Sequence, residues 1–489
     1  MKGFTLRPVR VIIRKKKLLE ETTLKYRVWL SILLSISLLT GCSTPFMWGD
    51  NISAKEGGDT LGLTPDFSYD VIEQTPNILI NQIGYLNEEN KTAILQGNDL
   101  ENVFYVYNAY TNTKEYEGTL KSDNLGKNKD AETEEAGEEE ITKDIYLADF
   151  SDVKVPGTYY LYHPDLGYSY EFKIGSKIYD EMEKNILSVL EEENKDTSLI
   201  CYQLTGLLIT KELYPQNVLE PEKLDEVCRK KMEKLMQAQD EKTGNVYANT
   251  SSAKLIQNLD DTQKQQYISL AATAEFAGTL AIYAYQLRDT DWNLAYQYQV
   301  AAEKAYRGIQ NSLDNVGYDA GYFAAAHLYR LTGRAKYAQA IGQYLSMKEE
   351  QKSYTEYDFS LFGDYAYLTL RHGTNLEWSE LIMKRIMEQA EEISLTARKN
   401  NYYVSDKREY NDINGKLRDM SNLALVNYII TNHEYSMLQK NYRDYFLGRN
   451  PYNICFADGF GTRNAVDEDI NINASNSGLF YLLLQSTKL

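Results

Sequence analysis

The chain has 489 residues, with 52 Lys and Arg against 70 Asp and Glu and a formal net charge of −18. Hydrophobic residues make up 43% of it, so it can bury more than one core, and its length predicts about two or three domains. An acidic chain repels phosphate backbones, which disfavours nucleic acid as a partner. The 41 Tyr residues either pack cores or form surfaces that stack on flat, hydroxylated ligands such as sugars.

The first predicted element is a secretory signal over residues 1–41. Basic residues from Lys2 to Arg27 precede an uncharged apolar run at 28–40, too short to span a bilayer stably. The sequence Leu-Thr-Gly-Cys ending at Cys42 resembles the lipobox of bacterial lipoproteins. That resemblance implies cleavage before Cys42 and a lipid on its sulfur. It also implies a place on the extracellular face of a bacterial membrane, with the lipid anchor as the only contact with the membrane. An ordinary signal peptide with an incidental cysteine is the alternative.

A tether and a β module follow the signal. Residues 42–75 are rich in Gly, Ser, Asp and Pro without periodicity, which predicts a lipidated tether. Residues 76–175 alternate in short β-rich segments, and about seven strands of this length are typical of an immunoglobulin-like β-sandwich. The acidic stretch at 121–144 interrupts them and predicts a disordered excursion. A calcium-binding loop there is the less favoured alternative, because no Asp-x-Asp spacing supports it.

Residues 176–489 have a helical pattern. The segment at 379–393 carries the apolar stripe of an amphipathic helix, and the segment at 268–287 is apolar nearly all round, as in a helix buried among helices. About twelve helical segments without a fixed repeat favour an (α/α)6 barrel over a solenoid. The predicted fold is therefore mainly α, with an (α/α)6 barrel preceded by a small β-sandwich. No histidine pair or cysteine spacing forms a metal motif, so we expect neither a metal nor a cofactor.

The order of signal, sandwich and helices, together with particular segments, resembles family 9 of the glycoside hydrolases, which carry an N-terminal immunoglobulin-like domain. The match covers about residues 77–485 with gaps. Its segments are residues 78–85, 149–162, 169–175, 272–284, 301–309, 327–337 and 442–461. The resemblance implies a cellulase-like barrel acting on β-1,4-glucans with inversion, and a β-glucan or related oligosaccharide as partner. The family's β-sandwich is usually structural.

The family's catalytic motifs are not found in this chain. Inversion uses an acid and a base roughly 6.5–9.5 Å apart, which the family takes from an Asp-Ala-Gly-Asp turn and an Asn-Glu pair. The Asp-Ala-Gly-Asp turn appears deleted between Gly206 and residue 234, so the base is unknown. A similar tetrapeptide occurs at 318–321, but its Asp319 is predicted to cap a helix. The acid's aligned position is Ile470. Glu468 nearby is the candidate acid, and a solvated acidic loop is its alternative.

Three functions remain open from the sequence, and whether the chain is an enzyme stays uncertain. The first is a surface glycan-binding protein that descends from a hydrolase and has lost catalysis. The second is an active inverting endo-β-1,4-glucanase that uses displaced carboxylates. The third is a non-catalytic scaffold of the cell envelope. Because general acid and base groups each contribute about 10²–10⁴-fold, losing both favours the first or the third.

Overall fold

The strands come first along the chain and the helices follow, as the sequence patterns predict. The computed structural model describes residues 75–122, 144–256, 258–310, 315–371, 373–409, 412–431, 433–465 and 471–488. The signal, the tether with Cys42, most of the acidic stretch, and the segment 466–470 with Glu468 and Ile470 lie outside these residues. The sandwich and the helices belong to one compact unit of the chain. None of the described helices is both long enough and apolar enough to cross a membrane.

The described strands form a two-sheet β-sandwich, which confirms the predicted fold of this module. They are β1 Ile78–Leu79, β2 Gly84–Tyr85, β3 Thr92–Gln96, β4 Phe104–Asn108, β5 Lys114–Gly118, β6 Lys121–Ser122, β7 Ile145–Asp149, β8 Gly157–His163, β9 Gly167–Tyr168 and β10 Phe172–Ile174. One sheet has the order β1-β3-β7-β6, and the other has the order β2-β10-β8-β4-β5, with β9 paired to β8. The strands outnumber the expected seven because β1, β2, β6 and β9 have only two residues each.

Side chains alternate between the two faces of each strand and so build the sandwich core. Phe104 and Val106 of β4 point inward and are buried, as are Tyr159 and Leu161 of β8. These residues pack against the inward side chains of the first sheet, such as Leu95. The pattern that predicted strands in the sequence is therefore the pattern that separates core from surface.

The helices form two concentric sets that differ in how they are buried. The inner set consists of α3 Thr197–Leu213, α7 Leu270–Leu287, α9 Tyr318–Thr332, α11 Ser360–Leu368, α13 Ile413–Ile430 and α15 Ser477–Ser486. The outer set consists of α2 Asp180–Glu191, α4 Pro221–Met236, α8 Trp292–Ile309, α10 Ala335–Leu345, α12 Leu376–Ala397 and α14 Ser436–Phe446. Inner helices are buried on nearly every side, whereas outer helices bury one face. Short elements α5 Ser252–Leu255, α6 Asp261–Gln265 and the 3₁₀ turn η2 Glu349–Gln351 lie in the connections.

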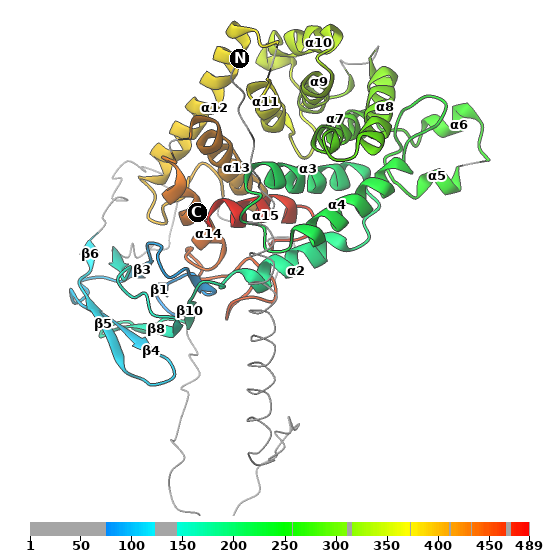
Figure 1. The fold of residues 1–489 in the computed structure, drawn as a ribbon. Helices are drawn as coiled ribbons and strands as arrows, with labels where there is room; N and C mark the ends of the chain where they lie inside the picture. The colour runs from blue at the N-terminus through cyan, green and yellow to red at the C-terminus, as the bar shows by residue number, and fades with distance from the viewer. Residues whose placement is uncertain are drawn as a thin grey trace, which may run out of the picture. The chain divides into compact units, whose positions relative to one another are not determined.

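The inner helices close into a ring, which confirms the (α/α)6 barrel. Each packs on the next in chain order, and α15 returns to pack on α3; Figure 1 shows α15 beside α3. Two glycines allow this closing contact. A Cβ atom on Gly206 would lie 2.7 Å from the backbone carbon of Gly478, and one on Gly478 would lie 2.8 Å from the carbonyl oxygen of Gln203. Any larger residue at these positions would push the two helices apart.

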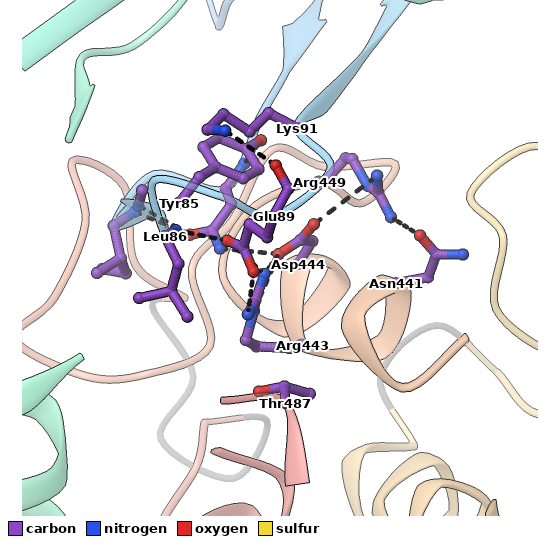
Figure 2. A network of polar contacts seen from close by, with 12 residues as sticks. Tyr85, Leu86, Glu89, Lys91, Asn441, Arg443, Asp444, Arg449 and Thr487 are labelled. Carbon is purple, nitrogen blue, oxygen red and sulfur yellow. Dashed lines mark hydrogen bonds and ion pairs between the residues drawn. The ribbon is translucent and has the colours of Figure 1, made fainter. Parts of the chain in front are cut away.

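The sandwich is joined to the helices by a buried polar network (Figure 2). Glu89, in the β2–β3 connection, accepts hydrogen bonds from Arg443 of α14, and both side chains are buried. Asn81 donates to the Asp444 carboxylate over 2.9 Å. Arg449 donates to Thr92 of β3 and, over 2.7 Å, to Asn441. The carboxylates of Glu89 and Asp444 pair with both guanidinium groups of the network, so neither arginine is buried without a counter-charge.

An apolar contact beside this network covers the outer face of the first sheet. Leu79, Ile94 and Ile145 point away from the sandwich core and pack against Tyr402 and Tyr403, in the connection after α12. The amide of Gln96 on β3 also donates to the Tyr402 hydroxyl over 2.8 Å. The first sheet is therefore apolar on both faces because one faces the second sheet and the other faces the helical barrel.

Candidate functional site

The six inner helices all begin at the same end of the barrel, because each outer helix reverses the chain between them. We call this end the barrel mouth. Helix N-termini carry partial positive charge, so six of them together favour negative groups at this end. Asp196, Ser269 and Asp412 cap α3, α7 and α13, and they accept hydrogen bonds from helix N–H groups at 2.8, 3.1 and 2.8 Å. Carboxylates on the N-caps and first seven residues of the inner helices, here called the mouth carboxylates, are the candidates for chemistry.

Glu275, on the second turn of α7, is a mouth carboxylate that is fully buried. Its Oε2 atom has no hydrogen-bond partner within the described part of the chain. Burial is the main cause that raises the pKa of Glu275 to about 8, and the nearby charges of Asp319 and Asp196 add to it. The carboxyl is therefore mainly protonated at neutral pH, and only a minor fraction of it is ionised there. Because it is buried, it also cannot reach a sugar without a movement of its cover.

Asp319, in the first turn of α9, has a role that differs from the one predicted. It is not the N-cap, which is Gly317, and no side chain caps this helix. Its carboxylate instead accepts hydrogen bonds from the Thr355 N–H at 2.8 Å, the Thr355 hydroxyl at 2.5 Å and the Phe359 N–H at 3.0 Å. Asp319 therefore anchors the connection before α11 rather than its own helix. Burial raises the pKa of its carboxyl despite these three bonds.

Four acids at the mouth, including the α13 cap Asp412, are held by arginines. Asp364 of α11 receives two hydrogen bonds from Arg385, one of them 3.1 Å long from Nε. Arg408 contacts both Asp419 at 3.2 Å and Asp412 at 3.4 Å. Asp358, just before α11, is paired in the same way with Arg418 at 2.8 Å. The hydrogen bonds from these arginines occupy the carboxylate oxygens that a catalytic acid or base would need to have free.

Several of these ion pairs line a cavity of about 170 Å³ at the mouth. Tyr354 lies at its edge with 47% of its surface exposed. Three residues further along the chain, the ring of Tyr357 stacks on Tyr202 of α3 with centroids 4.8 Å apart. The exposed ring of Tyr354 beside a polar cavity is suited to holding a sugar, whose C–H faces pack on aromatic rings and whose hydroxyls need polar partners.

Asp196 differs from the other mouth carboxylates because it is exposed. One of its oxygens accepts a hydrogen bond from the Leu199 N–H. No donor reaches the other oxygen from the residues that the structure describes. This oxygen could therefore hold a water molecule or a sugar hydroxyl.

Comparison with known proteins identifies the fold as that of a hydrolase family. Residues 192–468 match the protein family "Glycosyl hydrolase family 9". Residues 73–167 match the domain family "Cellulase N-terminal ig-like domain". The chain belongs to glycosyl hydrolase family 9. Endoglucanase D of Acetivibrio thermocellus is 30% identical over 169 residues, which are 34% of this chain and 22% of that protein. The aligned part thus spans about a fifth of this relative.

Solved structures of the family have the same fold. A Bacteroides ovatus family 9 protein superimposes with a TM-score of 0.65 at 14% identity, over 84% of this chain and 98% of that one. A metagenome-derived family 9 endoglucanase gives a TM-score of 0.62 at 20% identity, over 79% and 86%. A mutant endoglucanase of Alicyclobacillus acidocaldarius gives 0.62 at 19%, over 80% and 85%. At these identities the likeness shows the shared fold alone.

The predicted site residues of this family 9 chain fall outside the described mouth. Glu468 belongs to the segment 466–470 and is not among the described residues. The segment in which the catalytic turn appeared deleted consists of the end of α3, a connection at 214–220 and α4. This connection lies at the C-terminal ends of the inner helices, at the end of the barrel opposite the mouth. Within the described residues, no group of three or more His, Cys, Asp or Glu side chains could hold a metal.

Two mouth residues of the family 9 barrel were missed from sequence, although each leaves a signal. Asp196 directly precedes the long apolar pattern of α3, which is the usual place for an N-cap. Glu275 is the lone acid in the otherwise apolar segment 268–287, and a charged group in a buried helix points to an unusual environment. Neither signal indicates that the two residues share one end of a barrel.

Proposed function

We propose that this family 9 chain binds a β-1,4-glucan-type oligosaccharide at the barrel mouth and hydrolyses it negligibly. The observation that carries the proposal concerns the mouth carboxylates. Asp196 alone among those described is exposed and has an oxygen without a protein donor. Inversion needs two such groups, one as acid and one as base, on opposite sides of the sugar. The exposed ring of Tyr354 and the cavity beside it support binding.

An active inverting glucanase is the second candidate function. In it, Asp196 would hold the attacking water and Glu468 would supply the proton. The exposed, partly unengaged carboxylate of Asp196 is the observation that favours this alternative. A non-catalytic scaffold of the cell envelope is the third, and it would need no sugar contact at the mouth.

Two measurements on the purified chain separate the three. The first is release of reducing ends from mixed-linkage β-glucan, with an active family 9 endoglucanase as the positive control. The second is calorimetric titration with cellotetraose, repeated on Tyr354→Ala. Binding that Tyr354→Ala weakens, without turnover, supports the proposal. Turnover on the order of 1 per second or more would establish the glucanase instead, and absence of both binding and turnover would leave the scaffold.

We also propose that the chain is anchored to the outer face of a bacterial membrane through a lipid on Cys42. The support is the order of basic, apolar and Leu-Thr-Gly-Cys sequence at residues 2–42. Such an anchor would keep a glycan-binding barrel at the cell surface, where polymeric glucans are met.

A further inference from the structure

The outer face of the second sheet of the sandwich carries a cluster of tyrosines. They occupy alternate positions on three neighbouring strands, opposite the core-facing Phe104 and Val106 of β4 and Tyr159 and Leu161 of β8. We call this cluster the tyrosine face. Its members are Tyr105 and Tyr107 of β4, Tyr160 and Tyr162 of β8, and Tyr168 of β9.

The strand register brings these rings into direct contact. Tyr107 is the cross-strand partner of Tyr160, with ring centroids 5.5 Å apart and planes at 9°. Tyr105 is the partner of Tyr162, with centroids 6.3 Å apart. On the other side of β8, Tyr162 contacts Tyr168 at 4.9 Å. The five rings therefore form one continuous aromatic surface across three strands.

The tyrosine face is turned away from the helical barrel. In a sandwich, the outer faces of the two sheets point in opposite directions. The outer face of the first sheet is the one that Tyr402 and Tyr403 of the helical domain cover. The tyrosine face therefore lies on the far side, where Tyr168 has 53% of its surface exposed.

The hydroxyl groups on this face are mostly unused by the protein. The Tyr160 hydroxyl donates to Asn112. The hydroxyls of Tyr105, Tyr107, Tyr162 and Tyr168 have no hydrogen-bond partner within the residues that the structure describes. Cross-strand aromatic pairing alone would stabilise a sheet, but it does not require the polar end of tyrosine. Ring edges with free hydroxyls match a ligand that alternates C–H surfaces with hydroxyl groups.

Charge narrows the ligand class. The ion pair of Lys114 with Glu117, 2.8 Å apart, borders the face, so the edge of the face carries both a positive and a negative charge. The chain as a whole has a charge of −18, which repels nucleic acids and anionic polysaccharides. An uncharged polysaccharide carries no such penalty.

We infer that the tyrosine face is a second glycan-binding surface, which holds an uncharged β-glucan chain outside the barrel. The choice of glucan rests on the function proposed above for the barrel mouth. A long polymer could contact both surfaces of one molecule or of neighbouring molecules, whereas a short oligosaccharide would fill the mouth alone. The sandwich would then have a binding role in addition to packing against the barrel.

The test compares variants of the full chain in affinity electrophoresis through soluble mixed-linkage β-glucan and in calorimetric titration with cellotetraose. Tyr107→Thr with Tyr162→Thr removes one ring from each cross-strand pair and keeps residues that suit strands. We expect this double variant to bind the polymer about tenfold more weakly and to bind cellotetraose as the wild type does. Tyr107→Phe with Tyr162→Phe keeps the rings and should lose only about two- to threefold.

Matched variants and a folding readout complete the test. Trp292 and Tyr296 form another exposed stacked pair, on α8 of the barrel, and Trp292→Gln with Tyr296→Gln should leave both affinities unchanged. Calorimetric melting confirms that each variant is folded. Polymer binding that the Thr variant keeps but Tyr354→Ala loses would overturn the inference and leave the proposed function standing. If the wild type binds neither the polymer nor cellotetraose, both this inference and the proposed function of the barrel mouth are wrong. A wild-type dimer in sedimentation that the Thr variant abolishes would make the face a contact between copies and would also overturn the inference.

Discussion

Arg443 and Glu89 lie 354 residues apart in the chain, yet the guanidinium donates hydrogen bonds of 2.9 and 3.1 Å to the carboxylate (Figure 2). Arg443 also donates to Asp444, and its guanidinium lies 4.8 Å from the ring centre of Tyr179. All of these side chains are buried. This pair joins the sandwich to α14, so its loss should affect both modules together.

We predict that Arg443→Met destabilises the chain by about 3–5 kcal/mol, because Glu89 would remain buried without its counter-charge. Adding Glu89→Gln to that variant should recover part of the loss, since the unpaired charge is then removed. Differential scanning calorimetry measures both effects. The control is Glu88→Gln, which breaks the exposed pair of Glu88 with Lys154 and should hardly change the melting temperature. Equal melting of Arg443→Met and Glu88→Gln would contradict this account of the interface.

The contact of Gly206 with Gly478 gives a second prediction. Alanine favours a helix over glycine by about 1 kcal/mol, so Gly206→Ala would stabilise α3 if space were available. A Cβ there would instead meet Gly478 at 2.7 Å, and we expect a net loss of about 1–3 kcal/mol. Ser188→Ala, at an exposed position of α2, serves as the propensity control and should be neutral or slightly stabilising. A Gly206→Ala variant that melts higher than the wild type would show that α15 does not close on α3 as described.

Glu275 predicts a pH dependence of stability. Its pKa is raised from an ordinary 4.5 to about 8 in the folded chain, so the folded state keeps a proton that the unfolded state releases between these values. Stability that is fully present below pH 4.5 is therefore lost as the pH rises toward 8. Glu275→Gln removes this loss and should be more stable than the wild type by on the order of 4 kcal/mol at pH 8, with no difference at pH 4.

Melting temperatures from pH 4 to 8 check this prediction. Glu350→Gln, at an exposed position before α11, is the matched control and should leave the pH profile as it is. Wild-type and Glu275→Gln profiles that run parallel across this range would mean that Glu275 is ionised in the folded chain, as a catalytic base would need to be.

Membrane anchoring can be tested independently of the barrel. We predict that Cys42→Ala moves the chain from the membrane fraction to the soluble fraction or blocks its maturation, because the lipid would have no sulfur to occupy. Fractionation and electrophoretic mobility in a bacterial host measure this. Cys201→Ala, at a buried free thiol, should stay in the membrane fraction. A mature-length Cys42→Ala chain that still sediments with membranes would rule out the anchor.

The fold could be predicted from the sequence where the spacing of apolar residues shows which face of a strand or helix is buried. The alternation at residues 157–163 became β8, and the apolar stripe at 379–393 became part of α12, because the face that each side chain occupies follows from its spacing alone. The segments at 78–85 and 442–461, which carry the family resemblance, contact each other through Asn81 with Asp444 and Gln82 with Asn453. The resemblance therefore rests on residues that join the two modules.

The mouth could not be predicted in the same way. Asp196, Glu275 and Asp319 come from three different helices, and only the packing of α7 between α3 and α9 brings them within electrostatic reach of one another. Sequence placed Asp319 correctly at the start of a helix, but its partners Thr355 and Phe359 lie in the connection that leads into the next inner helix. Local pattern fixes which face is buried, whereas the partner of a buried charge depends on packing between distant segments.

The last prediction concerns catalysis, and it uses the two residues that an active enzyme would need. If the chain binds without turning over, Asp196→Asn and Glu468→Gln should each leave the low reducing-end release from mixed-linkage β-glucan unchanged. The reason is geometric. An isolated base can hold a water molecule, but without an acid on the other face of the sugar the leaving oxygen stays unprotonated. If the wild type instead turns over on the order of once per second, each substitution should lower that rate by about 10²–10⁴-fold. Asp196 would then be the base and Glu468 the acid of a displaced pair, and the binding-only function would be wrong.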